Sequence, residues 1–134
     1  MPENTTKAAG KYRGKPEYFL GFAELLMAAR RRGTVTYREI AFVTGLPMVG
    51  HQMATEVGTL LGEISEDEFR EGRPMLSALA VHEQDGQPGK GFFVLATQLG
   101  QLKDNSEDGK KRFWEKEVAA IYGVWRKKPN LPNL

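Results

Sequence analysis

Apolar side chains recur at helical spacing in four stretches of the chain, and each stretch predicts an amphipathic helix. The four predicted helices cover residues 18–32, 37–44, 51–64 and 112–126. In the first, the apolar residues fall at i, i+4, i+7, i+8 and i+11, which share one helical face: Tyr18, Phe22, Leu25, Leu26 and Ala29. The last carries an aromatic stripe that predicts docking on the body: Trp114, Val118, Ile121, Tyr122 and Trp125.

Local signals mark the middle helices. Thr36 and Glu39 form the capping-box pattern, in which each side chain bonds a backbone N–H of the other residue, so they predict the start of the second helix. Residues 46–50 contain a proline and a glycine and predict a turn. Two helices joined by a short turn make a helix-turn-helix unit. Residues 66–72 predict a further acidic turn of helix after a break near Ser65.

The period of the pattern then changes. Residues 75–81 and 91–97 are apolar on both faces, which is typical of covered strands. Residues 83–90 between them hold Asp-Gly and Pro-Gly turn signals, so we expect a hairpin with a wide loop. Residues 34–36 are β-prone and predict a short third strand.

This order of elements predicts an α+β fold, a winged helix-turn-helix with an extra C-terminal helix. An unrelated small α+β domain with the same element order is the alternative. The predicted organisation is a flexible basic arm over residues 1–16, a single domain over residues 17–126 and a tail over residues 127–134. One core suits a chain of 134 residues.

The composition removes several kinds of chemistry. The chain has no cysteine, which excludes disulfides, thiol nucleophiles and cysteine-based zinc sites. His51 and His82 are its two histidines, so a three-histidine metal site within one chain is excluded, and we expect no metal and no cofactor. Without an apolar run of the length that a membrane span needs or an apolar N-terminal signal, we expect a cytoplasmic protein that does not enter a membrane.

The net charge of +2 conceals an uneven distribution. Residues 1–51 hold eight basic and four acidic side chains, a net +4. Residues 52–109 hold four basic and eleven acidic, a net −7, and residues 110–134 hold seven and two, a net +5. Two basic ends therefore flank an acidic middle.

The leading functional hypothesis is a non-catalytic protein that binds nucleic acid, most readily double-stranded DNA. The second helix of such a unit reads base edges with its first residues, which are here His51, Gln52 and Thr55. Phosphate contacts would come from exposed cations: Lys7, Lys11, Arg13, Lys15, Arg38, Lys90, Lys110, Lys111 and Arg112. A solvated helix face is the plain alternative for the three readers, and an ordinary turn is the alternative for the loop at Lys90.

Three short segments carry a resemblance to a known family. Residues 34–41, 55–58 and 89–92 are similar to motifs of O6-alkylguanine-DNA alkyltransferases and alkyltransferase-like proteins, in their winged-helix DNA-binding domain. The resemblance is remote and covers under half of the chain. It implies that Tyr37 matches a tyrosine that acts near the target phosphate, and it implies a DNA-binding scaffold.

The departures from that family exclude its chemistry. Its Pro-Cys-His-Arg segment falls here near residues 76–79, which supply no Cys, His or Arg. Thr55 stands where the family has an intercalating arginine, which puts base flipping in doubt. The resemblance therefore does not imply alkyl transfer, and we expect no enzyme activity.

The rival hypothesis is a winged-helix protein–protein adaptor that uses the acidic middle. Glu56 and Glu63 on the expected reading helix favour it, because each would face a polyanion in a DNA complex. The partner-facing acids would be Glu56, Glu63, Glu66, Asp67 and Glu68.

Overall fold

A computed structural model describes residues 10–126 of the chain. Lys7, with the rest of the predicted arm up to residue 9, and the predicted tail at 127–134 lie outside the described residues. The described part is mostly helical with a small sheet, an α+β arrangement. In chain order its elements are α2 (Pro16–Arg30), β1 (Val35–Thr36), α3 (Tyr37–Thr44), α4 (Gly50–Arg70), the 3₁₀ helix η1 (Leu76–Leu79), β2 (Ala80–Val81), α5 (Lys90–Gln98) and α6 (Glu107–Trp125).

The predicted capping box begins α3. The backbone N–H of Glu39 donates to Thr36 Oγ1 at 3.0 Å, and the backbone N–H of Thr36 donates to the Glu39 carboxylate at 2.8 Å. Two N–H groups that the helix leaves without partners are thereby bonded. The helix ends at Gly45, whose φ of 78° lies in the left-handed region that favours glycine. The predicted pair of helices joined by a short turn, α3 and α4, is confirmed.

The predicted break near Ser65 is wrong, because α4 is continuous from Gly50 to Arg70. Ser65 is fully buried, and its hydroxyl donates to Ser77 Oγ at 2.6 Å. The same Ser65 oxygen accepts the backbone N–H of Ser77 at 3.0 Å. A serine weakens a helix when its hydroxyl competes for nearby backbone groups. Here a residue outside the helix occupies the hydroxyl, so this competition is removed.

The predicted hairpin is also wrong. β2 retains two residues of the predicted strand 75–81, and it pairs in parallel with β1, with Val35 opposite Ala80. Parallel neighbours need a long crossover connection, which α3, α4 and η1 supply here. The short strand predicted at 34–36 is confirmed as β1.

The other strand of the predicted hairpin, at 91–97, is the helix α5. A short continuous apolar run does not distinguish a buried strand from a buried helix. The helix buries Phe92 and Ala96, which lie one turn apart. The aromatic ring of Phe113 from α6 lies 5.9 Å from that of Phe92, so α5 is covered from the α6 side as well.

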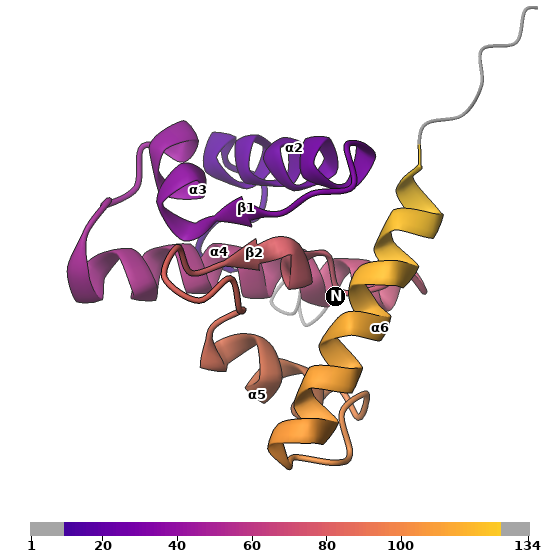
Figure 1. Cartoon of the computed structure of the whole chain (residues 1–134). Coiled ribbons are helices and arrows are strands. Elements are labelled where there is room, and N and C mark those ends of the chain that lie inside the picture. The colour runs from indigo at the N-terminus through magenta and orange to yellow at the C-terminus, as the bar shows by residue number, and fades with distance from the viewer. Residues whose placement is uncertain (1–9, 127–134) are drawn as a thin grey trace, which may run out of the picture.

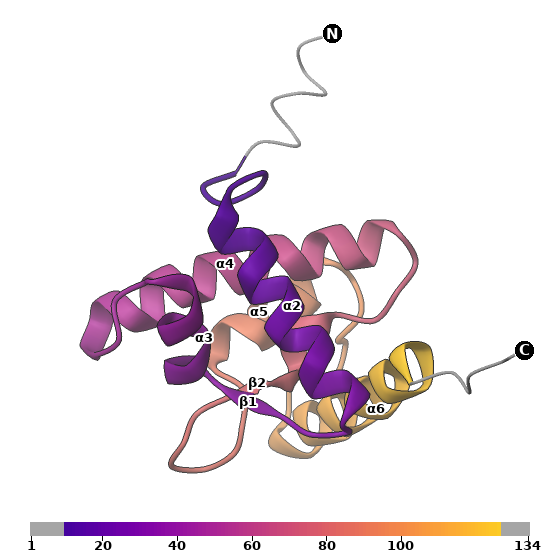
Figure 2. The ribbon, with the colours of Figure 1, turned by 90° about the horizontal axis from the view of Figure 1, so that it is seen from above.

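α4 spans the middle of the molecule, with α2 and α3 on one side of it and α5 on the other (Figures 1 and 2). The fully buried large side chains come from nearly every element: Leu25, Val35, Ile40, Val57, Leu60, Ile64, Met75, Leu76, Leu79 and Ile121. α6 docks through its aromatic stripe, as predicted. Trp114 Nε1 donates to the Ala78 carbonyl at 2.8 Å, and the Tyr122 hydroxyl donates to the Gly33 carbonyl at 2.9 Å.

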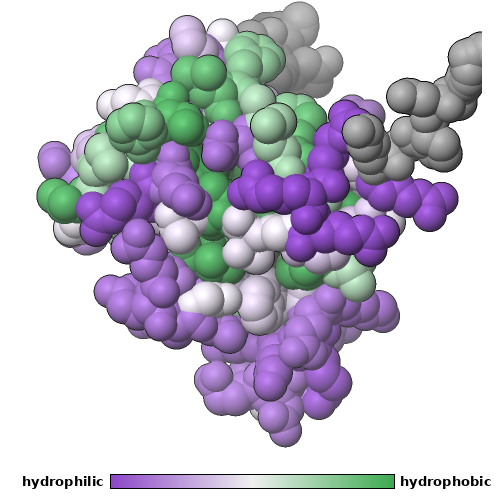
Figure 3. Space-filling model, turned by 45° about the horizontal axis from the view of Figure 1, so that its top comes forward, coloured by the Kyte–Doolittle hydropathy of each residue, from purple (hydrophilic) through white to green (hydrophobic). Residues whose placement is uncertain are grey.

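The surface is uneven in hydropathy. Figure 3 shows hydrophobic residues gathered over the upper part of the molecule, where α2 and α3 lie, above a more hydrophilic lower part. Within residues 10–126, every helix is too short or too polar to cross a membrane.

Candidate functional site

The segment just before α2 is tied to α4 by one buried carboxylate. Glu63 is 7% exposed and accepts three backbone N–H groups in succession, from Lys11 at 2.6 Å and from Tyr12 and Arg13 at 2.9 Å each. Burial of an ionised carboxylate is costly unless hydrogen bonds compensate it, and these three bonds do so. Tyr12 is itself 6% exposed. The described part of the predicted arm is therefore part of the packed body.

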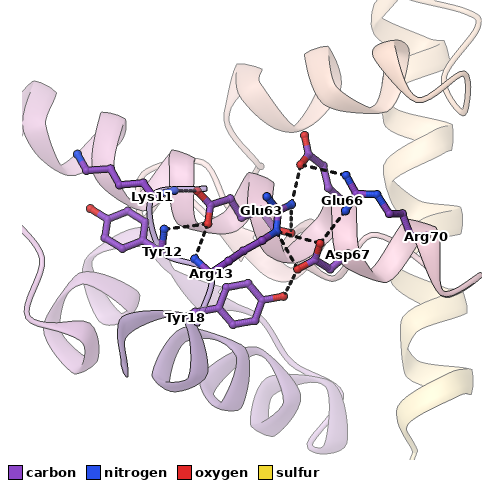
Figure 4. A network of polar contacts seen from close by, with 8 residues as sticks. All are labelled: Lys11, Tyr12, Arg13, Tyr18, Glu63, Glu66, Asp67 and Arg70. Atoms are coloured by element: carbon purple, nitrogen blue, oxygen red, sulfur yellow. Dashed lines mark hydrogen bonds and ion pairs between the residues drawn. The ribbon is translucent and has the colours of Figure 1, made fainter. Parts of the chain in front are cut away.

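The side chains of this segment complete the network (Figure 4). Arg13 bonds Asp67 through Nε at 3.0 Å and Glu66 through a terminal nitrogen at 2.8 Å. The Tyr18 hydroxyl donates to the other oxygen of Asp67 at 2.6 Å. Arg70 adds a second cation beside Asp67 at 2.8 Å.

The network shifts the titration of its members. Burial would raise the pKa of Asp67, but hydrogen bonds from Arg13 and Tyr18 outweigh it and hold the pKa below its ordinary value. Burial, with the hydrogen bond that its hydroxyl donates to Glu56, raises the pKa of Tyr12 to about 12. The hydrogen bonds from Lys11 and Tyr12 lower the pKa of Glu56. Glu56 and Asp67 are thus held in their charged form by groups of the same chain.

The acidic residues that were predicted to face a partner protein are bonded to other groups of the same chain. Glu56 pairs with Lys11 at 2.7 Å, and Glu68, a buried residue, pairs with Arg73 at 2.8 Å. With Glu63, Glu66 and Asp67 in the network above, each of the five predicted partner-facing acids has an internal cation or hydrogen-bond donor. Lys11 and Arg13, predicted as phosphate contacts, lie on this same side of α4.

Another side of α4 borders a cavity of about 500 Å³ between that helix and the start of α5. His51, Thr55, Gly58 and Gly62 follow one another at helical spacing, and the last three line the cavity. Glu56 and Glu63 lie about a third of a turn away from them around the helix. Among the described residues, no carboxylate lines the cavity. The residues that line it are Tyr37, Ala54, Thr55, Gly58, Thr59, Leu61, Gly62, Ser77, His82, Gly89, Lys90, Gly91, Phe92 and Leu95.

Close packing of Tyr37, His82 and Gly89 forms one wall of the cavity. The rings of Tyr37 and His82 are stacked with centroids 4.7 Å apart. The backbone N–H of Gly89 donates to the Tyr37 hydroxyl at 3.2 Å. A Cβ at Gly89 would lie 2.8 Å from that hydroxyl oxygen, so glycine is required there by proximity. Burial raises the pKa of Tyr37. This wall places the next residue, Lys90, at the cavity and at the first turn of α5.

The buried hydroxyl of Ser77 lies at the cavity wall formed by η1. Its oxygen accepts the hydroxyl hydrogen of Ser65 at 2.6 Å, and the backbone N–H of Ser77 donates to the Ser65 oxygen at 3.0 Å. The Ser77 hydroxyl hydrogen is then available as a donor toward the cavity. Sequence reasoning did not single out this serine, whose hydroxyl adds a polar group to an otherwise largely apolar lining.

The remaining predicted cations are spread over several elements. Arg38 on α3 contacts the Met48 carbonyl at 3.3 Å and Glu83 at 3.5 Å. Lys90 and Lys110 line a second hollow of about 390 Å³ between α5 and α6. Arg112 pairs with Asp104 at 3.1 Å. Lys15, Gln52 and Lys111 are exposed. The structure thus brings together Tyr37, Thr55 and Lys90 at the first cavity, with His51 one turn before Thr55.

The two glycines of α4 that open the cavity, Gly58 and Gly62, also escaped the sequence analysis. The signal present in the sequence was their spacing of four residues, which places both on one face of a helix. A Cβ at either position would meet nothing within 4 Å, so the helix surface is open there.

Among residues 10–126, no three His, Asp or Glu side chains are placed to hold a metal ion. The chain matches no protein-family model, no curated protein and no solved structure.

Proposed function

We propose that the chain binds double-stranded DNA without acting on it as an enzyme, through the first half of α4 and the start of α5. The observation that carries this proposal is the separation of charge around α4. Four acids of that helix, Glu56, Glu63, Glu66 and Asp67, are bonded by residues 11–13, whereas the lining of the cavity has no carboxylate among the described residues and includes Lys90. The objection that Glu56 and Glu63 would face a polyanion is therefore removed.

The proposed contact uses α3 and α4 as a helix-turn-helix unit. The first residues of α4, among them His51 and Gln52, are exposed and are therefore accessible to base edges in the major groove. The loop 82–89 is our candidate for the part of the predicted wing, and it projects from the body beyond β1, on the side away from α4 (Figure 2). Its acids have partners of their own, since Glu83 pairs with Arg38 and Asp85 accepts the Gln87 N–H at 2.9 Å.

Two helix N-termini support phosphate binding on this side. The first turns of α4 and α5 contain no acidic residue, and neither helix has a side-chain cap. Backbone N–H groups at such an end attract anions. Lys90 adds a full positive charge at the start of α5.

Fluorescence anisotropy with a labelled mixed-sequence duplex tests this proposal at several salt concentrations. We expect the logarithm of affinity to fall linearly with the logarithm of salt, and Lys90→Ala to reduce that slope by about one. Lys116→Ala on the exposed side of α6 removes the same charge elsewhere and is expected to leave the slope unchanged. His51→Ala and Thr55→Ala should weaken binding by about 1 to 3 kcal/mol each if they read bases.

Absence of binding at low salt would overturn the proposal, as would equal losses in Lys90→Ala and Lys116→Ala. The adaptor alternative receives less support from the same geometry, because Glu63 and Glu68 are buried and the other three acids are engaged within the chain.

A further inference from the structure

The exposed side of α2 carries an apolar stripe with one charge of each sign. Leu20, Glu24 and Met27 stand at i, i+4 and i+7, so they share one face of the helix, and Arg31, the residue that caps its C-terminus, follows at i+11. Met27 is 61% exposed and Leu20 is 47% exposed. Isolated apolar side chains are common on surfaces, but contiguous apolar patches mark interaction sites.

α3 extends this stripe into a wider patch. Phe42 is 71% exposed, the highest value among the large hydrophobic side chains that the structure exposes in residues 10–126. It lines a hollow of about 330 Å³ with Val43, Met48 and the charged residues Glu24, Arg38 and Glu39. Figure 3 shows hydrophobic surface spread across this upper part of the molecule, over α2 and α3. We call this the α2–α3 face, defined by Leu20, Glu24, Met27, Arg31, Phe42, Val43 and Met48.

The charges of the α2–α3 face lack partners of opposite sign. Glu24 makes no hydrogen bond or ion pair with any residue of the described range, and Arg31 reaches the Thr34 carbonyl at 3.2 Å but no described carboxylate. These two residues are seven positions apart, with Met27 close to their midpoint. If two copies of α2 cross antiparallel at Met27, Glu24 of each copy lies opposite Arg31 of the other.

We propose that the chain forms a two-fold symmetric dimer through the α2–α3 face. An isologous interface requires a self-complementary patch, and the pair Glu24 and Arg31 about Met27 supplies complementary charge on both sides of the axis. The partner is thus a second copy of this chain. Phe42 and the hollow beside it extend the apolar contact away from the axis.

The dimer face is separate from the cavity side of α4, although both proposals use α3 and the turn before α4. The α2–α3 face lies above α4, whereas the cavity with Lys90 lies between α4 and α5 (Figure 1). Association through α2 and α3 leaves the two hollows that Lys90 lines outside the interface. A failure of the dimer proposal therefore leaves the DNA proposal standing, and a failure of DNA binding leaves the dimer standing.

Sedimentation equilibrium over a wide range of protein concentration tests the dimer with charge exchange. We expect the unaltered chain to shift from monomer to dimer with concentration. Glu24→Arg and Arg31→Glu should each raise the dimer dissociation constant about tenfold or more, because each creates two like-charge contacts per dimer. The double exchange, E24R with R31E, should restore the constant to within about threefold of the original.

Glu115→Arg on the exposed side of α6 is the matched control and should not change association. Met27→Glu is a second test, because it places two like charges at the axis and should abolish the dimer while thermal melting shows a folded monomer. A chain that stays monomeric at every concentration would overturn the proposal. It would do so even if the α2–α3 face binds a different protein. Failure of the double exchange to restore association would overturn the predicted pairing.

Discussion

The Glu63 carboxylate accepts the backbone N–H of Tyr12 at 2.9 Å, across 51 positions of sequence. That contact is the centre of a three-bond cradle in which one side chain of α4 replaces the backbone partners of Lys11, Tyr12 and Arg13. It makes the segment before α2 a structural part of the domain.

Removal of the carboxylate should therefore destabilise the whole domain. Glu63→Ala leaves three N–H groups without their acceptor, and we expect the free energy of unfolding to fall by about 2 to 4 kcal/mol. Urea denaturation followed by circular dichroism measures this change. Glu115→Ala, at an exposed position on α6, should change it by less than about 0.5 kcal/mol. Equal stability of the two variants would contradict the proposed role of Glu63.

Stability should depend on the ionisation of Asp67 at acid pH. The pKa of Asp67 in the folded chain lies below its ordinary value, because hydrogen bonds from Arg13 and Tyr18 outweigh burial. Its contribution is then present above the unfolded-state pKa of about 3.9 and is lost as the pH falls through the lower folded-state pKa. Asp67→Asn should lower stability at neutral pH and flatten the decline below pH ~4. Melting temperatures measured from neutral to acid pH check this, with Glu115→Gln as the control; parallel curves for Asp67→Asn and the parent would refute it.

The contact between Gly89 and Tyr37 should not tolerate a methyl group. Gly89→Ala places a Cβ 2.8 Å from the Tyr37 hydroxyl oxygen and 3.2 Å from His82 Nε2, and we expect a loss of about 1 to 3 kcal/mol from overpacking. Gly91→Ala, two positions on, meets nothing within 4 Å and should be neutral or stabilising because alanine favours a helix. Adding Tyr37→Phe should recover part of the loss in Gly89→Ala, and strictly additive effects in that double variant would count against the contact.

A larger side chain at Gly58 should separate folding from binding. Its Cβ position is open, so Gly58→Leu should keep or raise stability, since leucine favours a helix by about 0.5 to 1 kcal/mol over glycine. The leucine would occupy the cavity side of α4 and should weaken DNA binding about tenfold. Gly123→Leu on α6 is equally open and serves as the matched control. If both variants bind DNA like the parent, the cavity side of α4 is not the contact surface.

Local signals in the sequence predicted a large part of the fold. The capping box of Thr36 and Glu39 predicted the start of α3, and helical periodicity predicted α2, α3 and the docking face of α6. These signals act within a few residues, so they survive in the folded chain. Where two structures satisfy the same local pattern, prediction failed. The apolar run 91–97 fits a buried strand or a buried helix equally well, and packing of Phe92 and Ala96 against the body selects the helix.

The candidate site was predicted in part. His51, Thr55, Tyr37 and Lys90 were expected at a DNA contact, and the structure places the last three at one cavity with His51 one turn away. Ser77 and the glycines of α4 were missed, because each takes its place at the cavity only through long-range packing. Lys11 was assigned to a flexible arm, but it is bonded to Glu56 and Glu63 of α4. These partners lie about fifty positions away, so the residues beside Lys11 in the sequence do not reveal them.

By itself, the sequence determined both ends of α3, the approximate extent of α2 and the start of α4, and it determined the division of charge into two basic ends and an acidic middle. Tertiary structure decided what that charge faces. Packing of residues 11–13 against Glu56, Glu63 and Asp67 pairs basic residues with acidic ones across about fifty positions, so that much of the acidic charge on α4 is held inside the chain. Long-range ion pairs require two segments to meet, and only the folded core brings them together.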